Sequence, residues 1–180
     1  MELKGVLAND ILDVMVSEEQ IAARIKELGK TIEKDYEDKD LILVCVLNGA
    51  SVFYINLMME LDMKLEMNFI RVSSYGSGTE TTGNVRILYD LEKDITGKDV
   101  LVVEDIIDSG NTLYNLKNVL AKRGARSVKC CALLDKPSRR EVDIEADYVG
   151  FEVPDKFLVG YGLDYDGYGR NYRDIYTIVQ

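Results

Sequence analysis

The stretch VLVVEDIIDSGNTL, residues 100–113, decides the fold of this chain. It begins as an apolar strand, continues through the acidic pair Glu104 and Asp105, and ends in a turn of small residues that opens a helix. Such a turn directs several backbone N–H groups to one place and can cradle a phosphate at the helix N-terminus. Asp108 is also a typical helix cap. The turn alone is therefore consistent with a phosphate site and with an ordinary capped helix.

The chain on either side alternates between short apolar runs and amphipathic segments. Apolar residues recur at three- and four-residue steps over 17–34 behind a Ser17 cap, which predicts a helix, and the apolar run 41–47 predicts a strand covered on both faces. Further strands are predicted at 66–74, 85–89, 100–103, 128–134, 148–151 and 157–161, and further helices at 51–61 and 112–123. The alternation predicts an α/β fold with a mainly parallel sheet flanked by helices, a small flap or hood, and a single domain over 1–180.

Composition narrows the class of protein. The 180 residues are 47% hydrophobic, and 32 acidic against 22 basic side chains give a formal charge of -10, which argues against a nucleic-acid partner. An anionic substrate would need local positive charge at its binding site, for example from a bound cation. The three cysteines lie in apolar runs and are odd in number, so we expect no disulfide framework. With no apolar run long enough to cross a bilayer and no signal-peptide core, we expect a cytoplasmic protein without a membrane partner.

The chain contains no histidine. This absence excludes Ser-His-Asp and Cys-His nucleophilic sites and zinc sites with imidazole ligands. Acid–base chemistry must then fall to carboxylates, lysines, tyrosines or a substrate group.

The segment 100–113 resembles the phosphoribosyl pyrophosphate motif of type I phosphoribosyltransferases, and the whole chain is similar to the hypoxanthine-guanine branch of that family. Other segments match in the family's order: Leu47-Asn48-Gly49 at its pyrophosphate-binding turn, Ser74-Tyr75 at the start of its flexible active-site loop, Leu133-Leu134-Asp135-Lys136 at its base-recognition lysine, and residues 157–175 at its purine-stacking and metal-binding segment. The resemblance implies the type I phosphoribosyltransferase fold and purine salvage. In that reaction the 5-phosphoribosyl group passes from phosphoribosyl pyrophosphate to N9 of hypoxanthine or guanine, giving IMP or GMP and pyrophosphate.

The resemblance also implies roles for single residues. Glu104 and Asp105 hold the ribose hydroxyls, and Asp108 is the general base that takes the N7 proton of the purine. The turn after Asp108 cradles the 5′-phosphate, and Arg170 reaches pyrophosphate. The complete set implied for the nucleotide and phosphoribosyl pyrophosphate is Asn48, Gly49, Glu104, Asp105, Asp108, Ser109, Gly110, Asn111, Thr112 and Arg170.

By the same resemblance, Mg²⁺ is the cofactor and Asp164 its protein ligand, because one carboxylate plus substrate oxygens and waters is a normal magnesium site. Lys136 selects 6-oxopurines, because an ammonium donates to O6 and accepts nothing from a 6-amino group. Phe157 stacks on the base, with Lys156 and Leu158 along its edge. Without the resemblance, the sequence favours a solvated loop acid for Asp164, an ordinary exposed lysine for Lys136 and a core aromatic for Phe157.

One position departs from the family pattern. Where the family commonly has a basic residue before the glycine of the pyrophosphate turn, this chain has Asn48 before Gly49. The resemblance also suggests a cis Asn48-Gly49 peptide, while an Asn-Gly pair is in any case well suited to a turn.

Two rival functions stay open at this point. One is a nucleotide-sensing regulatory protein on the same fold, since fold alone does not fix function. The other is a xanthine-preferring relative, because the bases differ at C2, where backbone carbonyls can decide. The expected partners are phosphoribosyl pyrophosphate, a 6-oxopurine and a second copy of the chain, in a homodimer or homotetramer.

Overall fold

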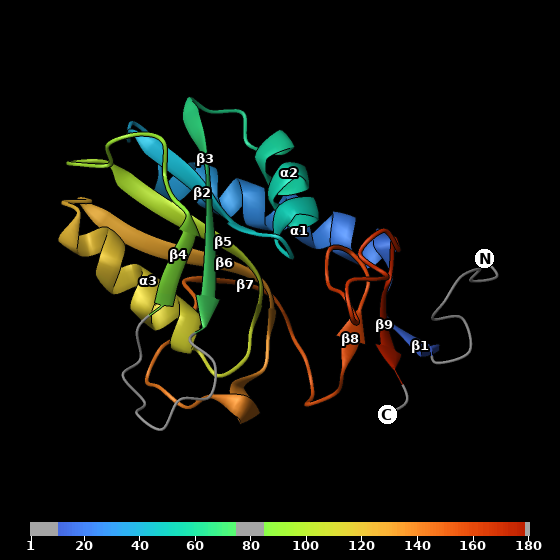
Figure 1. Cartoon of the computed structure of the whole chain (residues 1–180). Coiled ribbons are helices and arrows are strands. Elements are labelled where there is room, and N and C mark those ends of the chain that lie inside the picture. Colours follow the sequence, from blue (N-terminus) through green and yellow to red (C-terminus); the bar gives the residue numbers. More distant parts are fainter. Residues whose placement is uncertain (1–10, 75–84, 179–180) are drawn as a thin grey trace, which may run out of the picture.

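The structure, a computed structural model, describes residues 11–74 and 85–178. Its main element is a six-stranded sheet, parallel except for one antiparallel edge pair (Figure 1). In sheet order the strands are β4 (Val85–Tyr89), β3 (Leu65–Ser74), β2 (Leu41–Leu47), β5 (Asp99–Ile107), β6 (Ser127–Asp135) and β7 (Tyr148–Glu152). The predicted α/β class and mainly parallel sheet are confirmed.

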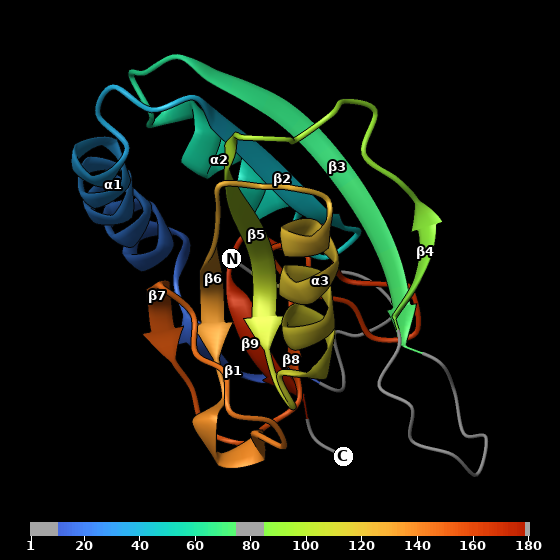
Figure 2. The same cartoon turned by 90° about the vertical axis from the view of Figure 1, so that its left-hand side faces the viewer.

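Three helices cover the two faces of this sheet, as predicted. Helices α1 (Glu18–Asp35) and α2 (Ser51–Met59) lie on one face and α3 (Asn111–Lys122) on the other (Figure 2). Ser17 begins α1 with a capping box: its hydroxyl accepts from the Gln20 N–H, and the Gln20 side chain accepts from the Ser17 N–H. Each helix turns an apolar stripe toward the strands, so the periodicity in the sequence reports the buried face.

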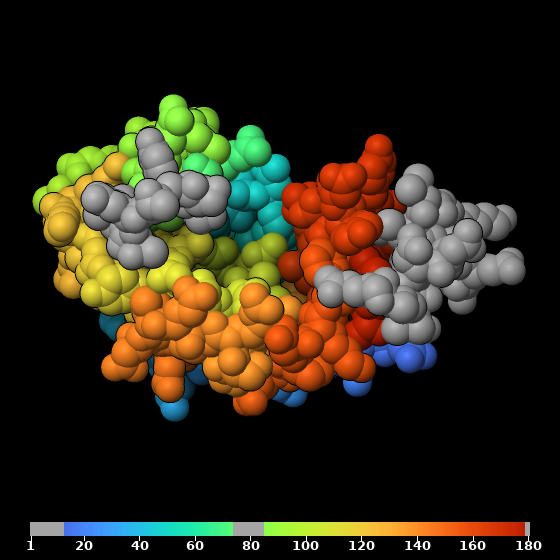
Figure 3. All heavy atoms as spheres, turned by 60° about the horizontal axis from the view of Figure 1, so that its bottom comes forward, coloured from blue at the N-terminus to red at the C-terminus, as the bar shows by residue number. Residues whose placement is uncertain are grey.

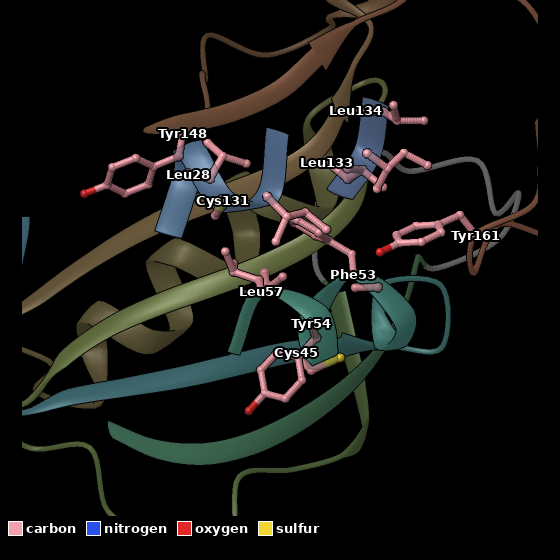
Figure 4. Packing of buried hydrophobic residues seen from close by; sticks show 14 of the residues in the cluster. Leu28, Cys45, Phe53, Tyr54, Leu57, Cys131, Leu133, Leu134, Tyr148 and Tyr161 are labelled. Carbon is pink, nitrogen blue, oxygen red and sulfur yellow. The ribbon is translucent and has the colours of Figure 1, made fainter. Parts of the chain in front are cut away.

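The core lies on both faces of the central strands. β2 is buried from its first residue through Val46 and packs on both faces, which explains why its sequence lacks polar alternation. Figure 4 shows the face covered by α1 and α2, where Phe53 and Leu57 pack toward Cys131 and Leu133. The buried hydroxyl of Tyr54 donates to the carbonyl of Leu43 at 3.0 Å and so keeps a hydrogen bond inside this core.

A second, antiparallel sheet joins the start and the end of the described chain, and we call it the hood. It consists of β1 (Ile11–Val16), β9 (Ile175–Ile178) and β8 (Leu158–Val159). Val16, Leu158 and Ile175 belong to the same buried cluster as α1 and α2, so the hood continues the core on that face. The predicted small flap or hood corresponds to this sheet, although β1 and β9 were not expected as strands.

Two predicted strand ends were wrong. The strand expected over 157–161 ends at Val159, because Gly160, Tyr161 and Gly162 all have positive φ (107°, 50° and 100°) and extended pairing cannot continue through them. The strand expected to stop before the acidic pair instead runs to Ile107, because its parallel pairing with β6 continues through Glu104. In the part of the chain that the structure describes, no helix is long and apolar enough to cross a membrane.

Candidate functional site

A cavity of about 510 Å³ opens where the parallel strands end, the edge at which open α/β sheets bind ligands. Figure 3 looks at this edge and shows the surface hollowed between the yellow-to-orange body and the orange-red segment. The cavity lies between the end of β5, the short helix η1 (Pro137–Arg139) and the chain that enters and leaves β8. It is lined by Asp105, Ile106, Asp108, Lys136, Arg139, Asp155, Lys156, Phe157, Leu158, Leu163 and Asp164.

The acidic pair lines two different cavities, because successive residues of a strand face opposite sides. Asp105 faces the large cavity, whereas Glu104 faces a smaller one of about 90 Å³ at the start of α3. Burial raises the pKa of Glu104 well above its usual range, and the neighbouring Asp105 adds to the shift. Burial also raises the pKa of Asp105 to about 6, against hydrogen bonds from backbone N–H groups and the charge of Arg170. A ligand that donates hydrogen bonds would offset this desolvation and stabilise the charged form of both carboxyl groups.

The smaller cavity has the features of an anion cradle. It is lined by Glu104, Ile106, Ile107, Asp108, Ser109, Gly110, Thr112 and Leu113. Within the described chain, the backbone N–H groups of Ser109, Gly110, Thr112 and Leu113 have no protein acceptor. Gly110 is the N-cap of α3 with φ +84°, and an added Cβ would lie 2.7 Å from Ile144. Asp108 therefore does not cap the helix, and the glycine lets the turn close with its N–H groups free.

Asn48 and Gly49 form the turn between β2 and α2 and lie against this edge. A Cβ on Gly49 would fall 1.6 Å from a carboxyl oxygen of Asp105, and a Cβ on Gly162 would fall 2.1 Å from the Gly49 carbonyl. The cis peptide bond is Leu47–Asn48, so the expectation of a cis Asn48-Gly49 bond was wrong by one residue. The sequence could not separate the two bonds, since neither contains proline. Asn48 itself is exposed.

Lys136 is buried, which contradicts its interpretation as an ordinary exposed lysine. Its side chain is 7% exposed, and its ammonium donates to the carbonyl of Lys156 at 2.8 Å. Its backbone N–H donates to Ile107 at 2.9 Å and fixes it beside the end of β5. An ammonium has three donors, so two remain for a ligand in the cavity. Among the described residues it has no carboxylate within ion-pair distance, which makes it a buried cation ready for an acceptor.

Phe157 is about one-third exposed and lies at the wall of the cavity. Its ring meets the ring of Tyr165 edge to face, with centroids 5.3 Å apart. This contact is a preferred aromatic geometry and leaves a ring face free for stacking. Leu158 is buried at the start of β8, and the backbone of Lys156 is already engaged with Lys136. The structure thus brings together the four residues expected to contact a base.

Asp164 and Arg170 belong to the loop that follows β8. The Arg170 guanidinium pairs with Asp164 Oδ1 at 2.6 Å and donates to the Gly162 carbonyl at 2.7 Å. The other oxygen, Oδ2, accepts from the Gly167 N–H at 2.8 Å. A carboxylate can accept up to about four hydrogen bonds or metal contacts, so both oxygens keep capacity toward the cavity. Within the described residues there is no group of three or more His, Cys, Asp or Glu side chains that could hold a metal ion.

The sequence model of the phosphoribosyl transferase domain matches residues 15–166. The chain belongs to the phosphoribosyltransferase family. Hypoxanthine phosphoribosyltransferase of Escherichia coli is 51% identical over 166 residues, which cover 91% of this chain and 92% of the relative. Hypoxanthine-guanine phosphoribosyltransferase of Streptococcus thermophilus is 49% identical and covers 92% of both. A bifunctional protein TilS/HprT of Listeria monocytogenes is 51% identical, and this chain spans 25% of its length.

Solved structures show the same relation. A hypoxanthine phosphoribosyltransferase from Staphylococcus aureus superimposes with a TM-score of 0.93 at 45% identity, covering 99% of this chain and 97% of the other. The fold of this phosphoribosyltransferase is therefore the type I fold found in hypoxanthine phosphoribosyltransferases. The resemblance inferred from the motifs is confirmed.

Two residues of the phosphoribosyltransferase cavity, Arg139 and Asp155, carry no motif in the sequence. Arg139 approaches Asp108 Oδ1 at 3.0 Å and Asp155 Oδ1 at 3.4 Å. The next residue, Arg140, is mostly buried and donates to the Asp108 carbonyl at 2.6 Å. In the sequence, only the group of basic residues around Pro137 points to this region, and it does not indicate which of their side chains enters the cavity. Ser74 is the last residue of β3, and Tyr75 lies outside the described residues, so the expected flexible loop is not described.

Proposed function

We propose that this protein salvages purines by transferring the 5-phosphoribosyl group of phosphoribosyl pyrophosphate to N9 of hypoxanthine or guanine, releasing IMP or GMP and pyrophosphate. The observation that carries the proposal is Lys136, a buried ammonium with free donors in the same cavity as Phe157 and Asp108. A buried cation is costly unless a ligand supplies acceptors. The relatives named for hypoxanthine and guanine, at about half identity over nearly the whole chain, support the same assignment.

The base binds in the cavity of about 510 Å³. Phe157 stacks on the purine, and Lys136 donates to O6. Adenine carries a 6-amino group in place of O6, and an ammonium offers no acceptor for it. The Lys156 carbonyl already accepts a hydrogen bond from Lys136. The edge of the base therefore lies along the backbone of both Lys156 and Leu158. Discrimination against adenine follows from leaving buried donors unpaired.

The phosphoribosyl group lies between the two cavities. The free N–H groups of Ser109, Gly110, Thr112 and Leu113 bind the 5′-phosphate, and the hydroxyls of Ser109 and Thr112 add donors. Glu104 and Asp105 accept from the ribose hydroxyls at the end of β5. The backbone at Asn48 and Gly49 and the fork of Arg170 meet pyrophosphate as it leaves. Asn111 completes the turn through its N–H, which donates to the Ser109 hydroxyl at 3.4 Å.

Displacement at C1′ passes through a cation-like sugar and needs an electron-rich base. Asp108 stands at the mouth of both cavities and takes the N7 proton as N9 attacks. Asp164 would hold Mg²⁺, and the bound ion would supply positive charge to neutralise pyrophosphate. Arg170, which pairs with Asp164, lies where it can exchange this partner for pyrophosphate oxygens. A cytosolic location and a homodimer or homotetramer remain part of the proposal, the first supported by three buried, unpaired cysteines.

A spectrophotometric assay tests the proposal. The protein is mixed with phosphoribosyl pyrophosphate, Mg²⁺ and one base at a time: hypoxanthine, guanine, xanthine or adenine. We expect IMP and GMP from the first two bases, no product from adenine, and loss of turnover on chelation. Equal use of adenine, turnover in excess chelator, or no turnover with any base would contradict the proposal.

A further inference from the structure

Two consecutive arginines hold Asp108 at two different points. Arg140 is mostly buried, pairs with Asp135 and donates to the backbone carbonyl of Asp108 at 2.6 Å. Arg139 reaches the side chain, with its Nε 3.0 Å from Asp108 Oδ1. The backbone is thus held by a buried contact, and the carboxyl group is held by a separate, half-exposed one.

The two oxygens of Asp108 differ. Oδ1 is buried, and the approach of Arg139 does not align as a hydrogen bond, so this oxygen is held by charge alone. Oδ2 has no hydrogen bond among the described residues and, unlike Oδ1, is accessible. The side chain as a whole is 45% exposed. One oxygen of the carboxyl group, Oδ2, is therefore accessible to a ligand at a residue that lines both cavities.

Arg139 is itself held from both sides. Its backbone N–H donates to the Lys136 carbonyl at 3.1 Å within η1, and its guanidinium reaches Asp155 Oδ1 at 3.4 Å. Asp155 precedes Lys156 and Phe157, which form the opposite wall of the cavity. The chain Asp155, Arg139, Asp108 thus spans the cavity mouth from the wall that stacks the purine to the group that receives its proton.

We infer that Arg139 is a positioning residue for the phosphoribosyl transfer: it fixes Oδ1 of Asp108 so that Oδ2 faces N7 of the bound purine, and Asp155 keeps Arg139 in place. This inference rests on the proposed function. A general base is effective only when a further group orients it, and a displacement of about 1 Å can cost roughly 100-fold in rate. A half-exposed ion pair adds little to folding, so stability does not account for the arrangement.

A double-mutant cycle tests the inference. The turnover number and the KM for hypoxanthine are measured with saturating phosphoribosyl pyrophosphate and Mg²⁺ for the parent, Arg139→Gln, Arg139→Lys, Asp108→Asn and the double variant Asp108→Asn with Arg139→Gln. Arg123→Gln is the matched control, because Arg123 also pairs with a half-exposed aspartate, Asp90 at 2.6 Å, but far from the cavity. Thermal unfolding of each variant shows that it is folded.

We expect Arg139→Gln to lower kcat roughly 10- to 100-fold with a smaller change in KM, and Arg139→Lys to recover part of the loss, since it keeps the charge without the fork. In the Asp108→Asn background, Arg139→Gln should add no further loss, because its effect passes through that carboxylate. Asp155→Asn should give a smaller loss that disappears in the Arg139→Gln background.

Three outcomes overturn the inference. Arg139→Gln with the kcat of the Arg123→Gln control would show that Asp108 needs no orientation. An equal loss in the Asp108→Asn background would mean that Arg139 acts on the substrate directly. A larger change in KM than in kcat would make it a binding group. An inactive parent would refute the proposed function, whereas an active parent with an unaffected Arg139→Gln refutes this inference alone.

Discussion

The two ends of β5 hold buried carboxylates in opposite states. At the first residue, Asp99 is 4% exposed and accepts hydrogen bonds from the Arg126 guanidinium and from the Ser127 hydroxyl, the second at 2.6 Å. The hydrogen bond from Arg126 lowers the pKa of Asp99. Near the other end, Glu104 is also buried and Asp105 is partly buried, neither has an ion pair in the described chain, and burial raises both pKa values. A partnered carboxylate stabilises the fold, whereas an unpartnered one is held for a ligand.

The cavities at the two ends of the sheet also differ in the burial of their charged side chains. The larger one, about 850 Å³, lies at the amino end of the sheet and is lined mainly by charged side chains of the α1 C-terminus and the loops before β2 and β3. Apart from Tyr36, Met63 and the partly buried Glu33, the lining residues are exposed lysines and acids. The cavity of about 510 Å³ at the carboxyl end contains the buried Lys136 and the partly buried Asp105. The site is therefore identified by the state of its buried charges and not by volume.

The largest effect should come from Asp108, beyond the unpartnered end of β5. Asp108→Asn keeps the shape of the turn but removes the acceptor for the N7 proton. We expect kcat to fall roughly 10²- to 10⁴-fold, the usual range for a positioned acid or base. Steady-state assays with hypoxanthine measure it, and near-normal turnover would reduce Asp108 to a structural residue of the turn.

The contrast between the two ends also predicts opposite pH effects on stability. The folded protein binds a proton at Asp105 more tightly than the unfolded chain, so this group's contribution is present at low pH and is lost as pH rises through its folded pKa of about 6. Near pH 8, Asp105→Asn should raise the free energy of unfolding by up to about 3 kcal/mol, the equivalent of a shift from 3.8 to about 6. The charge of Arg170 lowers the pKa of Asp105, and that of Asp164 raises it.

Asp99 should behave in the reverse sense. Its pKa is lowered, so its contribution is present above the unfolded value near 4 and is lost as pH falls. Asp99→Asn should therefore lower the free energy of unfolding near pH 8. Urea unfolding of both variants near pH 4 and near pH 8 measures the two slopes, and slopes of the same sign would remove the contrast.

A smaller effect is expected on base selection. Lys136→Gln offers both a donor and an acceptor at the purine 6-position, so the preference for hypoxanthine over adenine should narrow, by roughly 10- to 100-fold for one altered polar contact. Competition between the two bases measures the ratio. An unchanged ratio would place the discriminating group elsewhere in the cavity.

The smallest effect concerns the exposed Asn48. Asn48→Lys adds a positive charge beside the pyrophosphate turn and should lower the KM for phosphoribosyl pyrophosphate modestly, with little change in kcat. The effect should shrink at high ionic strength because salt screens an exposed charge. Measurement of the KM for phosphoribosyl pyrophosphate at two salt concentrations tests this prediction. A KM that is unchanged or raised at both concentrations would show that this side chain points away from pyrophosphate.

The sequence predicted the parts that local patterns encode. The run 100–113 indicated a strand, a turn and a helix, and apolar periodicity located α1, α2 and α3 to within two residues. The sequence predicted that a hood exists but not its strands β1 and β9. These two strands lie near opposite ends of the chain, and neither sequence indicates that it pairs with the other. The burial of Lys136 and the contacts of Arg139 depend on how η1 packs against β5, which no local pattern reports.

The most direct test of the central claim compares the two ends of β5 in one assay. The kcat/KM for phosphoribosyl pyrophosphate is measured for a variant with both Glu104→Gln and Asp105→Asn and for Asp99→Asn, each shown to be folded at the assay temperature. We predict that the first loses roughly 100-fold or more, since two hydrogen bonds to charged groups are lost, while remaining at least as stable as the parent. Asp99→Asn should keep normal kcat/KM with lower stability. Normal kcat/KM in the first variant, or an equal loss in folded Asp99→Asn, would contradict the account.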